Sequence, residues 1–234
     1  MQKQGNRVAA VLLLAASSLA IYAQQVGPLA PGERIRNLDK LKDDLRAYHD
    51  CSRSTVCYQR DLDLQAGRAI AFLQHRAAHA RPGDKLALVL DIDETTLSNY
   101  EELTGADFAS DSAKLNAWIE EGKAPAIAGT LRLYKEAQRL GVHVFFLTGR
   151  PESQRDITEK NLRAAGYDNW QQLILRQKGE ENATAQAYKS KARAGIVADG
   201  YRIILNVGDQ WSDLQGKPMA EYSVKYPDPY YFLK

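Results

Sequence analysis

The sequence predicts an α/β fold built on a doubly wound parallel sheet. Short, continuous apolar runs are typical of parallel strands that are buried on both faces, and segments with helical periodicity separate these runs. Strands that alternate with helices in this way indicate a parallel sheet with helices packed on its faces. The 234 residues are 44% hydrophobic and 26% charged, a composition that excludes a polytopic membrane protein and a largely disordered chain.

Residues 1–23 have the pattern of a secretory signal peptide. Lys3 and Arg7 precede an apolar run that is too short to span about 30 Å of hydrocarbon, and cleavage is expected after Ala20 or Ala23. An uncleaved N-terminal anchor is the alternative. Removal of the signal deletes only basic charges and leaves 29 basic residues against 29 acidic ones. We therefore expect a periplasmic or secreted protein with no membrane association after cleavage and no affinity for a nucleic-acid polymer.

Cys51 and Cys57 are the 2 cysteines of the chain. An even number of cysteines in an exported protein favours a disulfide over free thiols. Closing so short a loop would contribute about 2 kcal/mol to stability. A thiol nucleophile or a zinc site is the alternative, although no second Cys/His pair completes a zinc ligand set.

Residues 24–84 form the segment that precedes the first strand. Apolar side chains recur at helical spacing over residues 38–48 and again over residues 62–77. We expect two helices that pack as a hairpin, joined around the cysteines, and that lie against the core formed by residues 85–234.

The core contains the strands of the sheet and the helices that connect them. Apolar runs predict strands at residues 86–91, 142–147, 173–175 and 202–207. Helices are predicted at residues 131–140, from Pro151 and Glu152 onward, and at residues 183–198. Residues 96–127 contain short helical patterns and no strand pattern, which indicates a small helical cap inserted after the first strand.

Acidic and hydroxyl-bearing residues follow three of these strands. The first strand leads into Asp91-Ile-Asp-Glu-Thr95, the second into Thr148-Gly-Arg150, and the fourth into Gly208-Asp-Gln-Trp-Ser-Asp213. Ligands of open parallel sheets bind beyond the carboxyl ends of the strands. We therefore expect these three segments to form one site.

A site that gathers Asp91, Asp93, Asp209 and Asp213 needs a cation. Like charges about 4 Å apart repel each other by roughly 1 to 4 kcal/mol at effective dielectric constants of about 80 to 20. Oxygen ligands favour Mg²⁺, with Ca²⁺ or Mn²⁺ as weaker candidates, whereas zinc prefers histidine and cysteine. The predicted cofactor is therefore Mg²⁺.

The order of these motifs resembles the haloacid dehalogenase superfamily of aspartate-dependent phosphotransferases, which has a Rossmann-like core. Further segments resemble its acid phosphatase branch, which contains the secreted bacterial class C enzymes, the plant acid phosphatases and the vegetative storage proteins. These segments are the motif after the first strand extended to Tyr100, Tyr188-Lys-Ser190, Gly200-Tyr-Arg202, the motif after the fourth strand extended to Leu214, and the tail Tyr226-Pro-Asp-Pro-Tyr-Tyr231. The resemblance covers roughly residue 38 to the C-terminus.

The resemblance implies a role for each residue of the motifs. Asp91 would be the nucleophile that forms an aspartyl-phosphate, and Asp93 the general acid and base. Thr148 would bind a phosphoryl oxygen, and Lys189 would neutralise charge on the transferring group. The metal would be held by Asp91, Asp209 and the backbone carbonyl of Asp93, and Asp213 would bind it directly or support a ligand.

Three assignments stay open at this point. Lys191 lies two residues beyond Lys189 and is the alternative cation, although the Tyr-Lys-Ser context favours Lys189. Gly149 and Arg150 contact phosphate, or Arg150 caps the adjoining helix. Tyr100, Trp118 and Phe108 of the cap stack on the leaving group of the substrate, or they fill the core of the cap.

The expected function is that of a secreted, Mg²⁺-dependent acid phosphatase acting on small phosphomonoesters, with nucleoside monophosphates among the candidates. A phosphotransferase on the same fold and a non-catalytic relative of the storage proteins are the alternatives. The resemblance also makes a homodimer one of the expected assemblies.

Overall fold

The computed structural model of the protein describes residues 35–51 and 57–233. The chain divides into two compact units between Asp43 and Asp44, and α2 (Leu38–His49) spans this boundary. The fold is therefore described for residues 44–234. The predicted signal at residues 1–23 and the first residues of the predicted N-terminal segment lie outside the described residues.

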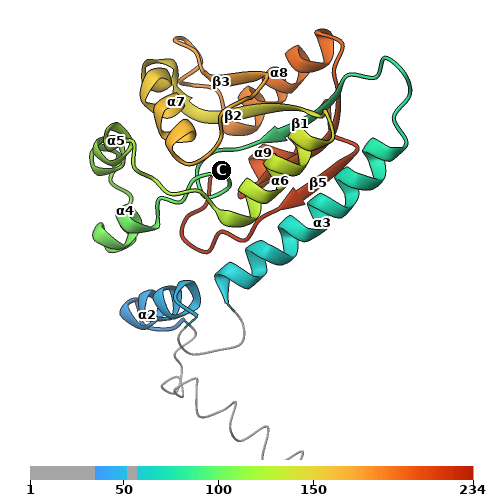
Figure 1. The fold of residues 1–234 in the computed structure, drawn as a ribbon. Helices are drawn as coiled ribbons and strands as arrows, with labels where there is room; N and C mark the ends of the chain where they lie inside the picture. Colours follow the sequence, from blue (N-terminus) through green and yellow to red (C-terminus); the bar gives the residue numbers. More distant parts are fainter. Residues whose placement is uncertain (1–34, 52–56, 234) are drawn as a thin grey trace, which may run out of the picture. The chain divides into compact units, whose positions relative to one another are not determined.

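The core of this unit is a sheet of parallel strands in the order β3-β2-β1-β4-β5 (Figure 1). Its strands are β1 (Leu86–Leu90), β2 (His143–Pro151), β3 (Gln172–Arg176), β4 (Arg202–Gly208) and β5 (Tyr222–Lys225). Every residue of β1 is buried, as its continuous apolar sequence requires. The predicted α/β class and the four predicted strands are confirmed.

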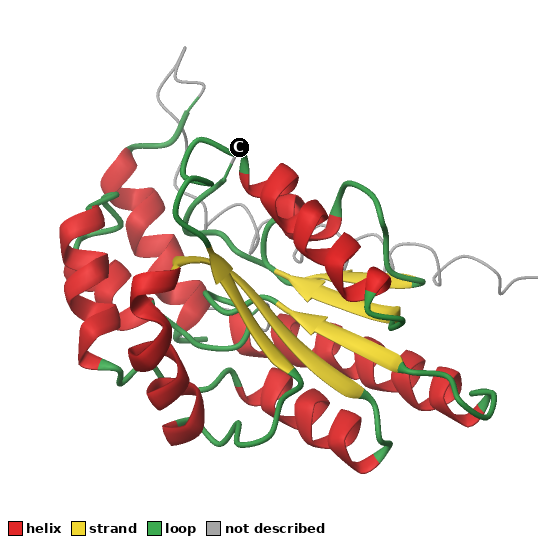
Figure 2. Cartoon of the chain, turned by 90° about the horizontal axis from the view of Figure 1, so that it is seen from above, coloured by secondary structure: helices red, strands yellow, loops and turns green. Residues whose placement is uncertain are grey.

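Helices cover both faces of the sheet, as Figure 2 shows. Side chains of α3 (Tyr58–Ala78), α6 (Ala128–Arg139) and α7 (Arg155–Ala164) share one large apolar cluster with Leu88 and Leu90 of β1. α8 (Ala185–Ala198) packs on the opposite face, where Ile196 meets Ala87 and Val89. Each fully buried aliphatic side chain stabilises the fold by about 1.5–3 kcal/mol.

The structure corrects two details of the sequence prediction. β5 has no counterpart in the prediction, because a short strand at the sheet edge with one buried residue lacks a continuous apolar run. The helix expected to open at Pro151 begins later, since Pro151 is extended and pairs with Arg176 of β3. A 3-10 turn, η1 (Glu152–Gln154), then leads into α7.

Between β1 and α6 the chain forms the cap helices α4 (Tyr100–Gly105) and α5 (Ser112–Glu121). Asp111 caps the start of α5 by accepting hydrogen bonds from two backbone N–H groups. Gly122 ends the helix in the left-handed conformation, with φ 61°, which a residue with a side chain rarely adopts. An isolated antiparallel β-bridge pairs Leu97 with Ala126, so the two ends of this segment lie side by side.

The end of α2 meets the start of α3 next to the predicted disulfide. Cys51 and Cys57 are joined by a disulfide, as predicted. The Tyr48 hydroxyl donates a hydrogen bond of 2.5 Å to Asp61, and its ring packs edge-on against Tyr58. Among the described residues, we find no helix with the length and apolar character needed to cross a membrane.

A short helix after β4 completes the elements that surround the carboxyl ends of the strands. α9 (Trp211–Leu214) begins within the motif that follows β4. The strand order reverses between β1 and β4, because the chain first moves outward through β2 and β3 and then returns to β4. Ligands of doubly wound sheets bind at such a switch point.

Candidate active site

The candidate site lies at the carboxyl ends of β1, β2 and β4. Asp91 directly follows β1, Asp209 directly follows β4, and Thr148 belongs to β2, and all three residues are buried. The parallel register places these strand ends at one edge of the sheet. The structure therefore brings together the three segments that the sequence analysis singled out.

Four charged side chains form what we call the Asp91 cluster: Asp91, Lys189, Asp209 and Asp213. The three carboxylates each have an oxygen within 4.8 Å of the others. The Lys189 ammonium donates hydrogen bonds of 2.5 Å to Oδ1 of Asp91 and to Oδ1 of Asp213. Lys189 projects from α8, so these contacts join α8 to the end of β1 and to α9.

The local fold explains how the carboxylates of the cluster are oriented. Oδ1 of Asp209 accepts a hydrogen bond from the Thr95 hydroxyl, and Oδ2 accepts one from the Gln210 side chain. Oδ2 of Asp213 accepts the backbone N–H of Gln210 at 2.8 Å, which closes the first turn of α9. A Cβ atom on Gly208 would overlap the Asp213 side chain, so only glycine fits there.

Arg193 fixes the loop that follows Asp213. This arginine of α8 is fully buried and donates hydrogen bonds to the backbone carbonyls of Asp213, Gln215, Gly216 and Pro218. A buried guanidinium is costly unless its N–H groups find acceptors, and these carbonyls supply them. Arg193 thus holds the backbone of Asp213 while Lys189 holds its carboxylate.

The Asp91 cluster carries more negative than positive charge. Burial raises the pKa of Asp91 well above its ordinary value, the Lys189 ammonium opposes that shift, and Asp213 and Asp209 add to it. Burial also raises the pKa of Asp209, and Asp213 adds to the shift. Burial alone would lower the pKa of Lys189, but Asp213 and Asp91 more than offset it, so the pKa is raised and Lys189 stays charged.

The chemistry of this cluster fits a hard divalent cation. All its candidate ligand atoms are carboxylate oxygens, and a cation beside them would relieve the repulsion among these negative charges. Both oxygens of Asp209 accept hydrogen bonds, from Thr95 and Gln210, and both oxygens of Asp213 are likewise in contact, with Lys189 and the backbone of Gln210. The carboxylate of Asp93 lies outside this group of candidate metal ligands.

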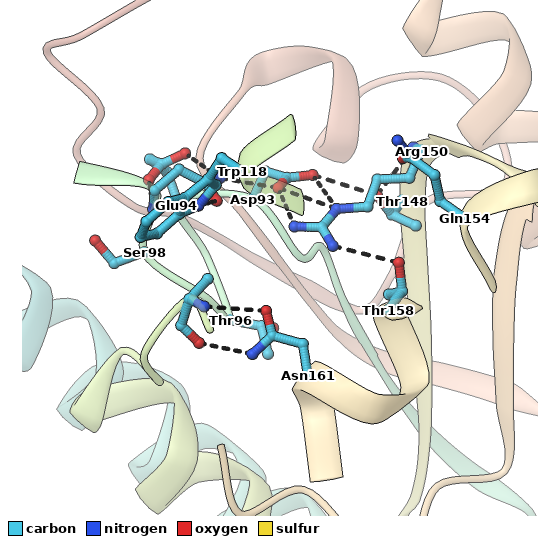
Figure 3. Close-up of polar contacts among 12 residues, drawn as sticks. Asp93, Glu94, Thr96, Ser98, Trp118, Thr148, Arg150, Gln154, Thr158 and Asn161 are labelled. Atoms are coloured by element: carbon cyan, nitrogen blue, oxygen red, sulfur yellow. Dashed lines mark hydrogen bonds and ion pairs between the residues drawn. The ribbon is translucent and has the colours of Figure 1, made fainter. Parts of the chain in front are cut away.

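Asp93 lies in a different set of contacts, which we call the Asp93 network: Asp93, Asn99, Trp118, Thr148 and Arg150. Figure 3 labels Asp93, Trp118, Thr148 and Arg150. The Arg150 guanidinium donates from Nη2 to Oδ1 of Asp93 at 2.7 Å and from Nε to both carboxylate oxygens at 3.2 Å. The Asn99 side chain adds a hydrogen bond of 2.9 Å to Oδ1. The Thr148 hydroxyl lies 3.5 Å from Oδ2.

The electrostatic balance around Asp93 is the reverse of that around Asp91. Burial alone would raise the pKa of Asp93, but the charge and hydrogen bonds of Arg150, with the hydrogen bond from Asn99, bring it below the ordinary value. The Arg150 side chain is 3% exposed, whereas the Asp93 side chain is 26% exposed. Of these two residues, only Asp93 is partly accessible to solvent. Asp93 is therefore a partly exposed carboxylate whose oxygens accept hydrogen bonds from Arg150 and Asn99.

The open assignments of the sequence analysis separate clearly in space. Lys189 contacts Asp91, whereas the Lys191 side chain is 77% exposed and pairs with Glu180 at 2.7 Å. Arg150 contacts Asp93 and Thr158 of α7, and its backbone N–H bonds to the Thr148 hydroxyl. Gly149 is exposed beside them.

The aromatic residues of the cap pack against protein neighbours. Trp118 is buried, and its indole N–H donates to the Asn99 side chain at 2.9 Å. The Tyr100 ring stacks on His49 with a centroid distance of 3.3 Å. The Phe108 ring stacks on Tyr230 with a centroid distance of 6.0 Å.

Several residues of the site escaped the sequence analysis. Glu94 is buried with φ 55°, and burial followed by the Asp93 charge raises its pKa well above the ordinary value. Gln210 joins Asp209 to Asp228 of the C-terminal tail through its side-chain N–H groups. Glu94, Gln210 and Asp228 lie within the motifs quoted above, but their spacing in the sequence does not predict these contacts. Asn99 lies five residues after Glu94, and a turn between the two residues could bring their side chains into contact.

A hollow of about 470 Å³ opens beside Asp209. Its lining includes Trp211, Lys225, Asp228 and Tyr231, which come from α9, β5 and the C-terminal tail.

Comparison with known proteins identifies relatives of this chain. The family model described as HAD superfamily, subfamily IIIB (acid phosphatase) matches residues 23–234. Acid phosphatase 1 of Solanum lycopersicum is 43% identical over 148 residues, which cover 62% of this chain and 58% of that protein. The stem 28 kDa glycoprotein of Glycine max is 36% identical over 169 residues, which cover 70% of this chain and 66% of that protein. The match thus spans less than two thirds of either plant protein.

A solved structure shares the fold. The class C acid phosphatase from Bacillus anthracis superposes with a TM-score of 0.66 at 22% sequence identity, covering 82% of this chain and 87% of that chain. The arrangement of the sheet and its flanking helices is therefore similar in the two proteins.

Proposed function

The chain belongs to the HAD superfamily, subfamily IIIB, and on that premise we propose that it is an acid phosphatase that hydrolyses small phosphomonoesters through an aspartyl-phosphate on Asp91. One observation carries the proposal. Asp91 contacts the Lys189 ammonium, and Asp93, two residues later, is a partly exposed carboxylate beside Thr148 and Arg150, which supports attack on phosphorus by Asp91 and proton transfer by Asp93.

In the first half of the reaction, an Asp91 carboxylate oxygen attacks the phosphorus atom. The bond from phosphorus to the ester oxygen breaks, and Asp93 gives its proton to that oxygen as the alcohol leaves. Lys189, which contacts Asp91, neutralises charge on the nucleophile and on the transferring group. The Thr148 hydroxyl, beside Asp93, donates to a phosphoryl oxygen.

In the second half, Asp93 takes a proton from water as the water oxygen attacks phosphorus. The acyl-phosphate bond breaks, inorganic phosphate leaves and the Asp91 carboxylate is regenerated. Arg150 favours the charged form of Asp93 that this step needs, since its guanidinium pairs with that carboxylate. One residue thus serves first as acid and then as base.

The cofactor in this proposal is Mg²⁺, bound by Asp91, Asp209 and the backbone carbonyl of Asp93. When bound, the ion would neutralise phosphate charge and so permit attack by a carboxylate. Asp213 would support the site through Lys189 and α9, in keeping with its contacts to that ammonium and to Gln210.

We also propose that the protein acts in the periplasm or outside the cell. The apolar run in residues 1–23 and the Cys51–Cys57 disulfide support export, because disulfides persist in oxidising compartments. In this proposal, residues 85–234 are the catalytic core and residues 96–127 its cap.

The test of the proposed function is phosphate release from an aryl phosphate by the wild type and by Asp91→Asn, each with Mg²⁺ and with EDTA. We expect Asp91→Asn to lower kcat by at least about a thousandfold, and EDTA to inhibit the wild type until Mg²⁺ is restored. Asp199→Asn, an exposed residue at the end of α8, is the matched control and should keep the wild-type rate. Wild-type turnover by Asp91→Asn would contradict the proposal.

A further inference from the structure

Asn99 is the buried residue that links Asp93 to the cap. Its side-chain Nδ2 donates to Oδ1 of Asp93 at 2.9 Å and to Oε2 of Glu94 at 3.0 Å. Its backbone N–H donates to Oε1 of Glu94 at 2.6 Å. On the other side, its Oδ1 accepts the indole N–H of Trp118, a residue of α5. Figure 3 shows Trp118 and Glu94 on one side of Asp93 and Arg150 on the other.

The chemistry of its neighbours determines which way the Asn99 amide faces. An indole N–H can only donate, and ionised carboxylates can only accept. The amide oxygen therefore faces Trp118, and the amide nitrogen faces the Asp93 carboxylate. If the indole N–H were removed, the amide oxygen would lose this donor, and the amide nitrogen would be held less firmly toward Oδ1 of Asp93.

This orientation makes the two oxygens of Asp93 unequal. Oδ1 accepts short hydrogen bonds from Asn99, at 2.9 Å, and from Nη2 of Arg150, at 2.7 Å. Oδ2 has only the longer contacts to Nε of Arg150, at 3.2 Å, and to the Thr148 hydroxyl, at 3.5 Å. An oxygen that already accepts two short bonds is poorly placed to carry a proton, so the proton belongs on Oδ2.

We propose that Asn99, oriented by the Trp118 indole N–H, is a positioning residue that presents Oδ2 of Asp93 as the oxygen that protonates the leaving group. This inference rests on the proposed function. In the step concerned, the bond from phosphorus to the ester oxygen breaks, its electron pair stays on that oxygen, and the proton moves there from Oδ2. Asn99 and Trp118 act through Asp93 and exchange no proton themselves.

The test uses Trp118→Phe, which keeps an aromatic ring at this position. The substitution removes the five-membered ring of the indole and with it the N–H donor. The substrates are nitrophenyl, phenyl and methoxyphenyl phosphate, which share a ring but differ in how much their leaving oxygen needs a proton. The measured quantity is kcat/KM, which reports on the steps up to cleavage of the ester. Trp170→Phe is the control, because that ring packs on Phe146 and on the Arg163 guanidinium, outside the Asp93 network.

We expect Trp118→Phe to lower kcat/KM for methoxyphenyl phosphate about tenfold more than for nitrophenyl phosphate, because general acid catalysis matters most for a poor leaving group. Trp170→Phe should leave the ratio between these substrates unchanged. Asn99→Ala should make kcat/KM depend more steeply on the leaving group, in the same direction. Thermal unfolding is measured to check that each variant is folded.

Each other outcome has a distinct meaning. An equal loss for all three substrates in both Trp118→Phe and Asn99→Ala would overturn the inference, since stacking on the substrate or a general structural defect lowers every rate alike. An unchanged profile in both variants would also overturn it. If the wild type hydrolyses none of the three esters, the proposed function itself fails and the inference falls with it.

Discussion

The Asp91 cluster and the Asp93 network begin two residues apart and differ in almost every physical respect. Around Asp91, buried carboxylates outnumber the ammonium of Lys189, and the pKa of Asp91 is raised. Around Asp93, N–H donors outnumber the carboxylate oxygens, and the pKa of Asp93 is lowered. The same residue type thus meets an excess of negative charge in one place and an excess of donors in the other.

This difference shows that the partners of a carboxylate decide what it can do. Asp91 contacts the Lys189 ammonium, whereas the oxygens of Asp93 accept hydrogen bonds from Arg150 and Asn99. The partners come from different elements: Lys189 from α8, Arg150 from β2 and Asn99 from the start of the cap. Changing one partner at a time therefore tests the comparison.

Substitution of Lys189 should have the largest effect of these tests. Lys189→Met leaves Asp91 and Asp213 buried without their shared cation, which typically costs about 3–5 kcal/mol of stability. We expect kcat to fall by about a thousandfold as well, because a positioned cation is lost from the transition state. Phosphate release and thermal unfolding measure the two effects.

Lys191→Met is the matched control for Lys189→Met. Its side chain is 77% exposed and pairs with Glu180 on the surface, so activity and stability should stay close to those of the wild type. A loss of activity in Lys191→Met as large as that in Lys189→Met would contradict the assignment of the cation to the Asp91 cluster.

Substitution of Arg150 tests the Asp93 network. Arg150→Gln removes the charge that offsets burial, so the pKa of Asp93 should rise. A general acid works only while it is protonated, and activity is lost as pH rises through its pKa. We therefore expect the alkaline limb of the kcat/KM profile to move to higher pH, with a fall in kcat/KM of about a hundredfold.

The control for this variant is Arg163→Gln, whose guanidinium side chain is 55% exposed and pairs with Glu159. It should leave the pH profile in place. An alkaline limb that stays put or moves to lower pH in Arg150→Gln would show that Arg150 does not govern the protonation of Asp93.

The smallest effect is expected where a guanidinium lowers the pKa of a carboxylate on the surface. Hydrogen bonds from Arg139, and then from Gln74, lower the pKa of Glu136 to about 2. Its contribution to stability is complete above the unfolded-state pKa, near the model-peptide value of about 4.3, and is lost as pH falls through about 2.

We therefore expect Glu136→Gln to lower Tm slightly at pH 7 and to match the wild type below pH of about 2. Thermal unfolding between pH of about 2 and pH 7 measures the difference in Tm between the variant and the wild type. Activity at pH 7 should not change. A large loss of Tm at pH 7 would mean that exposed and buried guanidinium pairs stabilise the protein to a similar extent.

Much of the fold was accessible from the sequence. The strands β1, β2 and β4 are buried on both faces and therefore leave continuous apolar runs that periodicity detects. β5 was missed because it lies at the sheet edge and buries only Val224. The start of α7 was misplaced because Pro151, a favoured first residue of helices, here extends β2.

Part of the site was accessible for a similar reason. Asp91 and Asp209 lie at the carboxyl ends of predicted strands, so their convergence is a consequence of parallel pairing. The contacts of Asn99 with Trp118 and of Gln210 with Asp228 join residues 19 and 18 positions apart through side chains alone. No periodicity or strand end marks such contacts.

The sequence by itself determined the parallel sheet, the acidic strand ends and the family motifs, because backbone pairing and apolar burial repeat at regular intervals along a chain. Only the tertiary structure decided that Lys189 contacts Asp91 while Lys191 faces solvent, and that Arg150 pairs with Asp93. Those outcomes depend on the rotation of a helix against the sheet and on which donors and acceptors meet in the buried interior. Neither the rotation of the helix nor the pairing of donors and acceptors can be predicted from the local order of residues.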